Sequence, residues 1–272
     1  MNEFMQVMSL PFFTCLILAG IHAYLGLHVI ERQVIFVDLA LAQIAALGAS
    51  LALVFGYGMD SAQSYWISLG FTVAGAAIFS LTRLKKQRVP QEAIIGIVYA
   101  VSASLLVMIL SHSGEGDEHI REALFGNILL IRLPEILKIL GIYSAVGIFH
   151  AIFRRQFLLI SRDPAGAYRQ GLRVRFWDFL FYVSFGIVVT SSVKIAGVLL
   201  VFSFLVVPSS AAVLFSNGTK TRLLFGWAVG FIASVLGMAL SYYFDYPTGA
   251  SVVCVFGGLL AVLAVIKALF FK

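Results

Sequence analysis

Charged residues and cysteines are scarce in this sequence, and each shortage narrows the class of protein. Only 12% of the 272 residues are Asp, Glu, Lys or Arg, whereas 61% are hydrophobic and the mean hydropathy is +0.99. A soluble domain of this length cannot hide so much apolar surface, so the surrounding solvent must be lipid. Both cysteines, Cys15 and Cys254, fall inside apolar stretches, which indicates neither a disulfide framework nor a thiolate metal site.

The sequence also lacks the motifs of an ATPase or a hydrolase. It has no Gly-x-x-x-x-Gly-Lys-Ser/Thr phosphate-binding loop, and residues 217–221 resemble one only superficially. The motif His-Glu-x-x-His is missing, and the five histidines form no cluster in the sequence. We therefore expect neither enzymatic activity nor a tightly bound cofactor, because a membrane-embedded enzyme would have no catalytic constellation to use.

Apolar runs long enough to cross a bilayer, about 20 residues each, recur along the whole chain. The pattern gives about nine such spans. A count of about eight to ten is compatible with it, because the turn at 191–197 is so tight that one of the two flanking spans can be a broken or re-entrant helix. We predict an all-α polytopic membrane protein with one transmembrane domain, residues 1–272. Residues 1–8 lack a basic region and no cleavage site follows them, so we expect the first span to be retained. The predicted spans are 8–29, 34–56, 63–82, 93–111, 134–153, 176–193, 195–215, 223–243 and 249–270.

Lys and Arg are distributed unequally between the two sides of these spans. If the N-terminus is outside, only Arg121, Arg132, Lys138 and Lys194 of the 19 basic residues face outward. Inner segments carry more Lys and Arg in membrane proteins, so we predict an outer N-terminus and a cytoplasmic C-terminus. This distribution explains the formal charge of +6 without a nucleic-acid partner. The inner residues are Arg32, Arg83, Lys85, Lys86, Arg88, Arg154, Arg155, Arg162, Arg169, Arg173, Arg175, Lys220, Arg222, Lys267 and Lys272.

The span 34–56 carries a carboxylate, Asp38, and an amide, Gln43, among many small residues. Small side chains let helices approach closely, and an ionisable group inside a membrane is a candidate functional residue. Two interpretations stay open at this point. Either the span is a tightly packed interior helix whose Asp38 pairs with a nearby Lys or Arg, or it is a wall of a solute pathway.

Two loops are long enough to carry a function. The outer loop, 111–133, is acidic in its first half and then reads Ala-Leu-Phe-Gly-Asn at 123–127. In the inner loop, Ser161 or Asp163 suits a helix N-cap, Pro164 the first turn and Gly171 the C-cap. We predict a short amphipathic helix at about 161–175 on the cytoplasmic face; the alternative is a helix held only by anionic lipid.

Two features inside the later spans concern helix packing. Gly226 and Gly230 form a Gly-x-x-x-Gly pair, which is typical of close contact between membrane helices. Pro208 removes a hydrogen bond to the carbonyl of Phe204, which predicts a helix kink there.

Several motifs, taken in order, resemble the membrane permeases of binding-protein-dependent ABC importers for zinc, manganese or iron. The resemblance spans nearly the whole chain. Its motifs are Val34-Ile-Phe-Val-Asp-Leu-Ala-Leu-Ala-Gln-Ile-Ala-Ala-Leu-Gly48, Glu92-Ala-Ile-Ile-Gly-Ile97, Leu124-Phe-Gly-Asn-Ile-Leu129, Ala196-Gly-Val-Leu-Leu-Val continuing to Val206-Val-Pro-Ser-Ser-Ala-Ala212, and Asp245-Tyr-Pro-Thr-Gly-Ala250.

The resemblance implies a type II ABC-importer-like fold and an assembly of several chains. These are a permease homodimer in a bacterial plasma (inner) membrane, two copies of a separate ATP-binding subunit and an extracytoplasmic metal-binding protein. It also makes the segment 161–175 similar to a coupling helix that docks into the ATPase, with Arg162, Asp163, Ala167 and Gly171 as candidate contact residues.

The chain departs from the family pattern in its second span, where Gln43 replaces a His and the acid, Asp38, lies five residues before it. Five residues turn a helix by about 500°, so these two side chains point roughly 140° apart and are not expected to bind one ion together. The family's acid in the fourth span matches Glu92. Carboxylate and amide oxygens favour manganese or iron and imidazole favours zinc, so zinc and manganese both stay open, with iron third.

We therefore predict a permease subunit that gives a divalent metal ion a path inward, driven by ATP hydrolysis on another chain. Asp38, Glu92, His28 and His150 are predicted near one membrane level and form a candidate inner gate, with Gln43 on the pathway. The alternatives are a siderophore or cobalamin permease of similar fold and a proton-coupled secondary transporter, for which no inverted repeat is found. For Asp38 itself, the alternative is a structural ion pair with Arg32 or Arg88.

Overall fold

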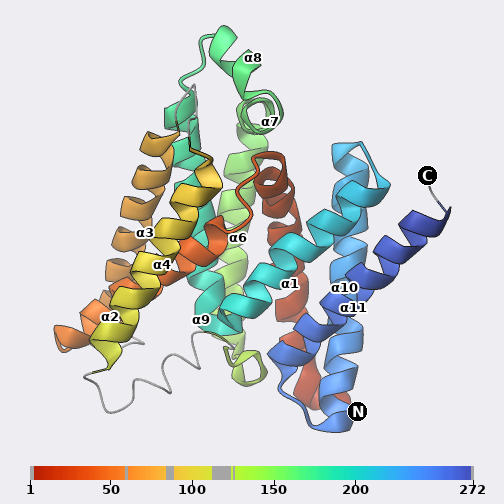
Figure 1. Ribbon diagram of the computed structural model, residues 1–272. Coiled ribbons are helices and arrows are strands. Elements are labelled where there is room, and N and C mark those ends of the chain that lie inside the picture. The colour runs from red at the N-terminus through yellow and green to blue at the C-terminus, as the bar shows by residue number, and fades with distance from the viewer. Residues whose placement is uncertain (1–2, 59–60, 84–88, 112–123, 125, 271–272) are drawn as a thin grey trace. The chain divides into compact units, whose positions relative to one another are not determined.

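The computed structural model describes residues 3–58, 61–83, 89–111, 124 and 126–270, and that part of the chain is built from helices and short connections (Figure 1). Eight of the described helices are long and apolar enough to cross a membrane. The helices are α1 (Glu3–Glu31), α2 (Val37–Val54), α3 (Ala62–Thr82), α4 (Gln91–Leu110), η1 (Ile128–Leu130), α6 (Leu133–Ile152), α7 (Arg154–Arg162), α8 (Pro164–Arg169), α9 (Val174–Phe215), α10 (Thr219–Phe244) and α11 (Thr248–Phe270).

Helix α9 contains two of the predicted spans. Its 42 residues extend over roughly 63 Å at the rise of an α-helix, about twice the thickness of the hydrocarbon core. Gly197 interrupts it with non-helical backbone angles, φ 74° and ψ 161°, and therefore separates a helix before it from a helix after it. The predicted spans 176–193 and 195–215 correspond to these halves. The fold class of an all-helical membrane protein with about nine spans is thus confirmed.

The described helices divide into two compact units. Unit 1 is formed by 1–30, 124–144 and 194–272, and unit 2 by 31–123 and 145–193. Two long helices, α6 and α9, contribute one part to each unit. That the whole chain forms one transmembrane domain remains a prediction.

Small residues set the packing of α1 against α10 in unit 1. A Cβ atom added to Gly230 would lie 2.9 Å from Cβ of Ala19, and one added to Gly226 would lie 3.4 Å from Cβ of Ala23. Glycine is therefore needed at Gly230 for the helices to approach this closely, and the Gly-x-x-x-Gly pair has the packing role that the sequence predicts.

Two of the sequence motifs meet at the interruption of α9. The backbone N–H of Asn127 donates a hydrogen bond to the carbonyl oxygen of Ile195 at 3.2 Å. Gly126 and Gly197 both have positive φ, and a Cβ atom on Gly126 would overlap the backbone between Ala196 and Gly197. The Leu-Phe-Gly-Asn motif therefore closes the break in α9 by satisfying a carbonyl group that the interruption frees.

Pro208 lies further along α9, where its backbone keeps helical angles. Its neighbour Ser209 donates a hydrogen bond from Oγ to the carbonyl oxygen of Ala23 at 3.1 Å. Within α9 the backbone departs from helical angles at Gly197, further back along the helix. The kink at Pro208 therefore remains a prediction.

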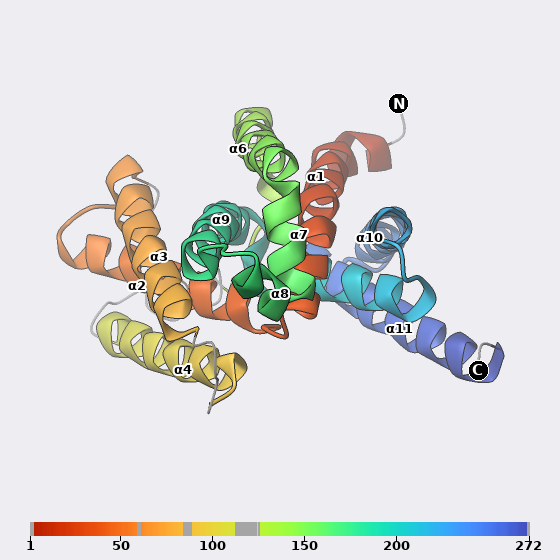
Figure 2. The same cartoon turned by 90° about the horizontal axis from the view of Figure 1, so that it is seen from above.

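In unit 2, α2 lies against both α3 and α4 and is the most buried of the candidate spans among the described residues (Figure 2). Gly48 on α2 approaches Ser68 so closely that a Cβ atom would lie 2.8 Å from its Cα. A Cβ atom on Gly75 of α3 would lie 2.5 Å from Cδ1 of Ile44. The small residues of the span 34–56 therefore serve contact with other helices, as the sequence predicts.

The segment predicted as one helix at about 161–175 contains the end of α7, all of α8 and the start of α9. Helix α7 begins at Arg154, within what the sequence suggested as a loop. Asp163 is the N-cap of α8 and accepts a hydrogen bond from the backbone N–H of Gly166 at 2.8 Å, so it and Ser161 are not alternatives for one cap. Helix α8 ends at Arg169, and Gly171 follows with φ 74°.

Candidate functional site

Asp38 and Glu92 lie near each other at the N-terminal ends of α2 and α4. The side chain of Asp38 is buried, with 2% of the residue exposed. In the described part of the chain its carboxylate has no side-chain partner and faces the backbone N–H groups of Asp38 and Leu39 at the start of α2. Oε1 of Glu92 accepts a hydrogen bond at 3.0 Å from the backbone N–H of Phe36, just before α2, and Glu92 acts electrostatically on Asp38. Two acidic groups therefore share this end of unit 2, and the buried one, Asp38, has no counter-charge among the described residues.

Gln43 is buried in the same helix as Asp38, one and a half turns further along. Five residues correspond to a rise of roughly 7.5 Å and a rotation of roughly 140°. The structure therefore keeps Gln43 and Asp38 on different sides of α2, as the spacing predicts.

The histidines predicted for the gate have other neighbours in the structure. His150 is buried, its Nε2 atom lies 2.8 Å from Oγ of Ser184, and its ring stacks on Phe157 with centroids 4.3 Å apart. His28 belongs to unit 1, where its ring contacts that of Tyr24. Among the described residues no group of three or more His, Cys, Asp or Glu side chains is arranged to hold a metal ion. The structure thus brings two of the four predicted gate residues together, and the gate role remains a prediction.

The ion pair expected between Asp38 and Arg32 is not present. Nη1 of Arg32 instead donates to Oδ1 of Asp178 at 2.5 Å, and Nη1 of Arg83 donates to the same oxygen at 2.8 Å. That alternative is therefore wrong, because Arg32 is engaged by a different carboxylate. The other partner considered for Asp38, Arg88, lies outside the described residues.

Asp178 is the residue that sequence reasoning missed. It is completely buried on α9, where two arginines contact it. The guanidinium carbon of one of them, Arg32, lies 4.0 Å from the ring centroid of Phe181. Burial lowers the pKa of Arg32, and the carboxylate of Asp178 opposes that change. The rule that drew attention to Asp38 also applies here, because Asp178 is a lone acid inside a predicted span, 176–193.

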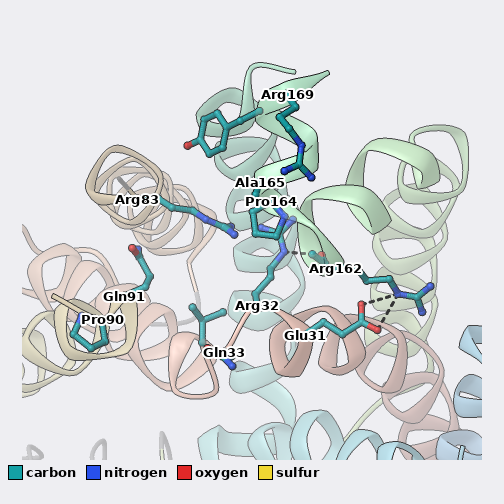
Figure 3. A pocket seen from close by; sticks show the side chains of 13 residues that line it. Glu31, Arg32, Gln33, Arg83, Pro90, Gln91, Arg162, Pro164, Ala165 and Arg169 are labelled. Carbon is teal, nitrogen blue, oxygen red and sulfur yellow. Dashed lines mark hydrogen bonds and ion pairs between the residues drawn. The ribbon is translucent and has the colours of Figure 1, made fainter. Parts of the chain in front are cut away.

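A cavity of about 680 Å³ adjoins this charged group (Figure 3). Its lining comes from the segment before α2, the end of α3, the start of α4 and the α7–α8 segment, all in unit 2. Figure 3 shows Arg83 and Gln91 on one side of the cavity and Arg162 beside Glu31 on the other. The described basic residues that line it are Arg32, Arg83, Arg162 and Arg169, all predicted for the inner side of the membrane.

The residues predicted to contact an ATPase have partners within the chain. Nε of Arg162 donates to Oε1 of Glu31 at 3.1 Å, and Asp163 caps α8. Ala167 is fully buried in an apolar cluster with Ile160 and Val174, which attaches α8 to the rest of unit 2. Of the candidate contact residues, Ala167 therefore cannot reach a partner chain without a change of conformation.

The exposed surface of α8 is formed by other side chains. Arg169 is 75% exposed at its side chain, and its Nη2 atom lies 3.6 Å from Oδ2 of Asp163. Ala165 is also exposed. The outer loop 111–133, the other long loop, is described only at 111, 124 and from Gly126 onward, so its acidic half lies outside the described residues.

Comparisons with known proteins cover nearly the whole chain. A model of the ABC 3 transport family matches residues 2–268. The manganese transport system membrane protein MntC of Listeria innocua is 28% identical over 201 residues, which are 71% of each chain. The manganese import system permease protein ScaB of Streptococcus gordonii is 25% identical over 241 residues, 88% of this chain and 84% of ScaB.

Solved structures share the fold. One is PsaBC from Streptococcus pneumoniae in complex with Fab, with a TM-score of 0.78, 22% identity and coverage of 96% of this chain and 91% of that chain. Another is an inward-facing putative metal-chelate type ABC transporter, with a TM-score of 0.72 and 17% identity, covering 95% of this chain and 86% of that one. At these identities the likeness shows the helical arrangement alone.

Proposed function

The chain belongs to the ABC 3 transport family, and from this membership we propose that it gives manganese a path into the cell, driven by ATP hydrolysis on a separate subunit. It is a multi-pass membrane protein and the transport component of an ABC transporter. The observation that carries the proposal is the extent of the family match, from residue 2 to residue 268, because it reaches every described span. Membership of an ABC family also overturns the alternative of a proton-coupled secondary transporter.

Manganese is the cargo that the relatives and the side chains favour together. MntC and ScaB are named for manganese transport or import. Asp38, Gln43 and Glu92 supply hard oxygen donors, which suit manganese, whereas zinc prefers imidazole. His150 lies against Ser184 and Phe157 in the same unit, which makes a zinc site there the weaker candidate. The likeness to a metal-chelate transporter concerns the fold and adds no support for a chelate as cargo.

Asp38 and Glu92 form the acidic pair through which we propose that the cation passes at the inner end of its path. A buried carboxylate without a counter-ion is unfavourable in a low-dielectric interior, and a passing divalent cation would neutralise it. Two carboxylates are also few ligands for such an ion, so it could leave again. In this role Asp38 attracts the cation, and Glu92, held by the N–H of Phe36, adds a second charge near the entrance of the same helix pair.

The assembly that we propose contains two copies of the permease, two of an ATP-binding subunit and one extracytoplasmic metal-binding protein, in a bacterial inner membrane. We place the N-terminus outside and the C-terminus in the cytoplasm. The gathering of Arg32, Arg83, Arg162 and Arg169 around one cavity supports this orientation, since cytoplasmic ends of spans are rich in basic residues. Helix α8 then faces the ATP-binding subunit, with Ala165 and Arg169 as its exposed contact residues.

The metal content of cells tests this function. Cells that lack the gene, grown with limiting manganese, should contain less manganese than their parent, with zinc and iron unchanged, when metals are measured by mass spectrometry. A plasmid copy of the wild-type chain should restore the manganese. A deficit confined to zinc would contradict manganese as the cargo, and equal contents of all three metals would contradict metal import.

A further inference from the structure

A buried charged cluster joins the α7–α8 segment to the membrane helices of unit 2. We define the Asp178 cluster as Asp178, Arg32, Arg83 and Ser161. Asp178 belongs to α9, Arg83 directly follows α3, Ser161 is near the end of α7, and Arg32 lies between α1 and α2. All four residues are at most 9% exposed.

Arg32 is the central member because its guanidinium contacts two helices at once. Nη1 donates to Asp178 Oδ1 at 2.5 Å, and Nε donates to Ser161 Oγ at 2.9 Å. Its planar group also lies over the ring of Phe181. Ser161 is two residues before Asp163, the N-cap of α8, so the link from α9 reaches the start of that helix directly. Figure 3 shows Arg32 beneath Pro164 and Ala165.

The hydrogen bonds of the Asp178 cluster are incomplete in this conformation. Both arginines donate to the same oxygen of Asp178, while Oδ2 of Asp178 and Nη2 of Arg32 are buried without partners among the described residues. The hydroxyl of the adjacent Tyr182 interacts electrostatically with Asp178, Arg32 and Arg83. Arginine and carboxylate groups commonly form two parallel hydrogen bonds. Oδ2 of Asp178 and Nη2 of Arg32 are the two atoms that a second arrangement, with two parallel bonds between Arg32 and Asp178, would join.

The surroundings of the cluster allow such a change. The cavity of about 680 Å³ lies beside Arg32, Arg83 and the first residues of α8, so these groups are not packed on every side. Helix α8 has only six residues and is attached through an apolar cluster on one face. A short helix of this kind can shift as a unit while its attachment to α9 is kept.

We propose that the Asp178 cluster is a positioning device that transmits movement of the α7–α8 segment to α9 and α3 by exchanging between these two arrangements. The inference rests on the proposed function, in which α8 meets an ATP-binding subunit. It assigns to Arg32 and Ser161 a role in coupling, meaning the number of metal ions imported for each ATP hydrolysed. Neither residue touches the cargo in this account.

The coupling ratio of the reconstituted transporter tests the inference. Arg32→Lys keeps the positive charge beside Asp178, but one ammonium group cannot reproduce the planar fork that contacts Asp178 and Ser161 together. We expect ATP hydrolysis to continue while the number of manganese ions imported per ATP falls about fivefold or more. A change of about fivefold is at the lower end of the effects that coupled sites usually have on each other. Ser161→Ala, which removes the Arg32–Ser161 hydrogen bond without changing any charge, should lower the ratio in the same direction.

Ser203→Ala is the matched control. Ser161 and Ser203 are both buried and both donate to the carbonyl oxygen four residues earlier, at 2.8 Å, so the control accounts for loss of that bond. Its coupling ratio should equal that of the wild type. Wild-type ratios in Arg32→Lys and Ser161→Ala would overturn the inference. The inference would also be overturned if uptake and ATP hydrolysis fell by the same factor, in proportion to the amount of folded permease. The cluster would then have a structural role only. Failure of the wild-type complex to import manganese with ATP would instead contradict the proposed function.

Discussion

At the scale of single residues, two buried aspartates of unit 2 have opposite environments. Asp178 accepts hydrogen bonds from two arginines, whereas the carboxylate of Asp38 has no side-chain partner among the described residues. A paired buried carboxylate contributes to the fold, and its removal leaves the partner charges uncompensated. An unpaired buried carboxylate is a cost to the fold, which suggests that it is kept for function. The two residues should therefore respond differently to the same substitution.

We predict that Asp38→Asn assembles normally and loses transport. Asparagine has nearly the same shape, and among the described residues the change leaves no counter-charge unpaired. Manganese uptake should fall about tenfold or more, which is the decrease in activity typically seen when a residue that supports a metal site is mutated. Glu92→Gln should show a weaker form of the defect. Uptake by purified, reconstituted dimers measures both, and wild-type uptake by an assembled Asp38→Asn variant would exclude the gate role.

Asp178→Asn is the matched comparison and should fail at an earlier stage. Removing one partner of a buried ion pair costs about 3–5 kcal/mol, here with two guanidinium groups left facing each other. We expect a lower yield of monodisperse permease and a lower thermal unfolding temperature in detergent than for Asp38→Asn. Equal stability of the two variants would show that the arginines do not depend on Asp178.

At the scale of elements, apolar length and small-residue spacing predicted most of the helices. The predicted spans agree with the observed helices within a few residues in most cases, because the 3.6-residue period and the Gly and Pro positions are local signals. Gly226 and Gly230 were predicted as packing residues and contact α1. The division of 155–175 into α7 and α8 was not predicted, because it depends on the burial of Phe157 and Ile160 against other elements.

The interruption of α9 provides a test at this scale. Gly126→Ala places a Cβ atom against the backbone of Ala196 and Gly197 and imposes positive φ on an alanine. The backbone conformation alone costs roughly 1–2 kcal/mol, and the overlap adds to it. We expect a lower unfolding temperature and lower uptake. Gly141→Ala, on α6 with open space at its Cβ position, is the control and should resemble the wild type; a Gly126→Ala variant as stable as that control would contradict the role of the junction.

The exposed surface of α8 provides a second test. Arg169→Glu reverses a charge on a side chain that is 75% exposed, so the fold should be retained while binding of the ATP-binding subunit weakens. Co-purification of the two subunits measures that binding. Arg222→Glu would be a poor comparison because Arg222 donates a hydrogen bond to the carbonyl oxygen of Ser216. Arg132→Glu is the better control, since Arg132 lies before α6, at its predicted outer end, and is not part of the α7–α8 segment. Equal co-purification of Arg169→Glu, Arg132→Glu and the wild type would leave α8 as a lipid-facing helix.

At the scale of the whole molecule, composition and charge predicted the class of protein, and the order of motifs predicted its family. The site was predicted less completely. Asp38 and Glu92 were expected at one level of the membrane, and they lie near each other. The neighbours of His28 and His150 could not be predicted from their depth in the membrane, because depth does not determine which face of a helix a side chain occupies. The pairing of Arg32 with Asp178, 146 residues apart, carries no local signal at all.

The orientation in the membrane is a property of the whole chain and can be measured directly. In a variant without Cys15 and Cys254, Arg169→Cys on α8 should react with an impermeant thiol reagent only after cells are opened. Tyr246→Cys, at an exposed residue between α10 and α11, should react in intact cells. The reverse pattern would invert the topology that the basic residues predict.

The most direct test of the central claim is ATP-driven manganese uptake by purified components. The chain is reconstituted in proteoliposomes with its ATP-binding subunit inside and the metal-loaded binding protein outside, and radiolabelled manganese in the lumen is counted. With ATP in the lumen, manganese should accumulate above its outside concentration, and a non-hydrolysable ATP analogue should abolish this. Accumulation that is the same with the analogue, or that follows an imposed proton gradient instead of ATP, would contradict an ATP-driven manganese permease.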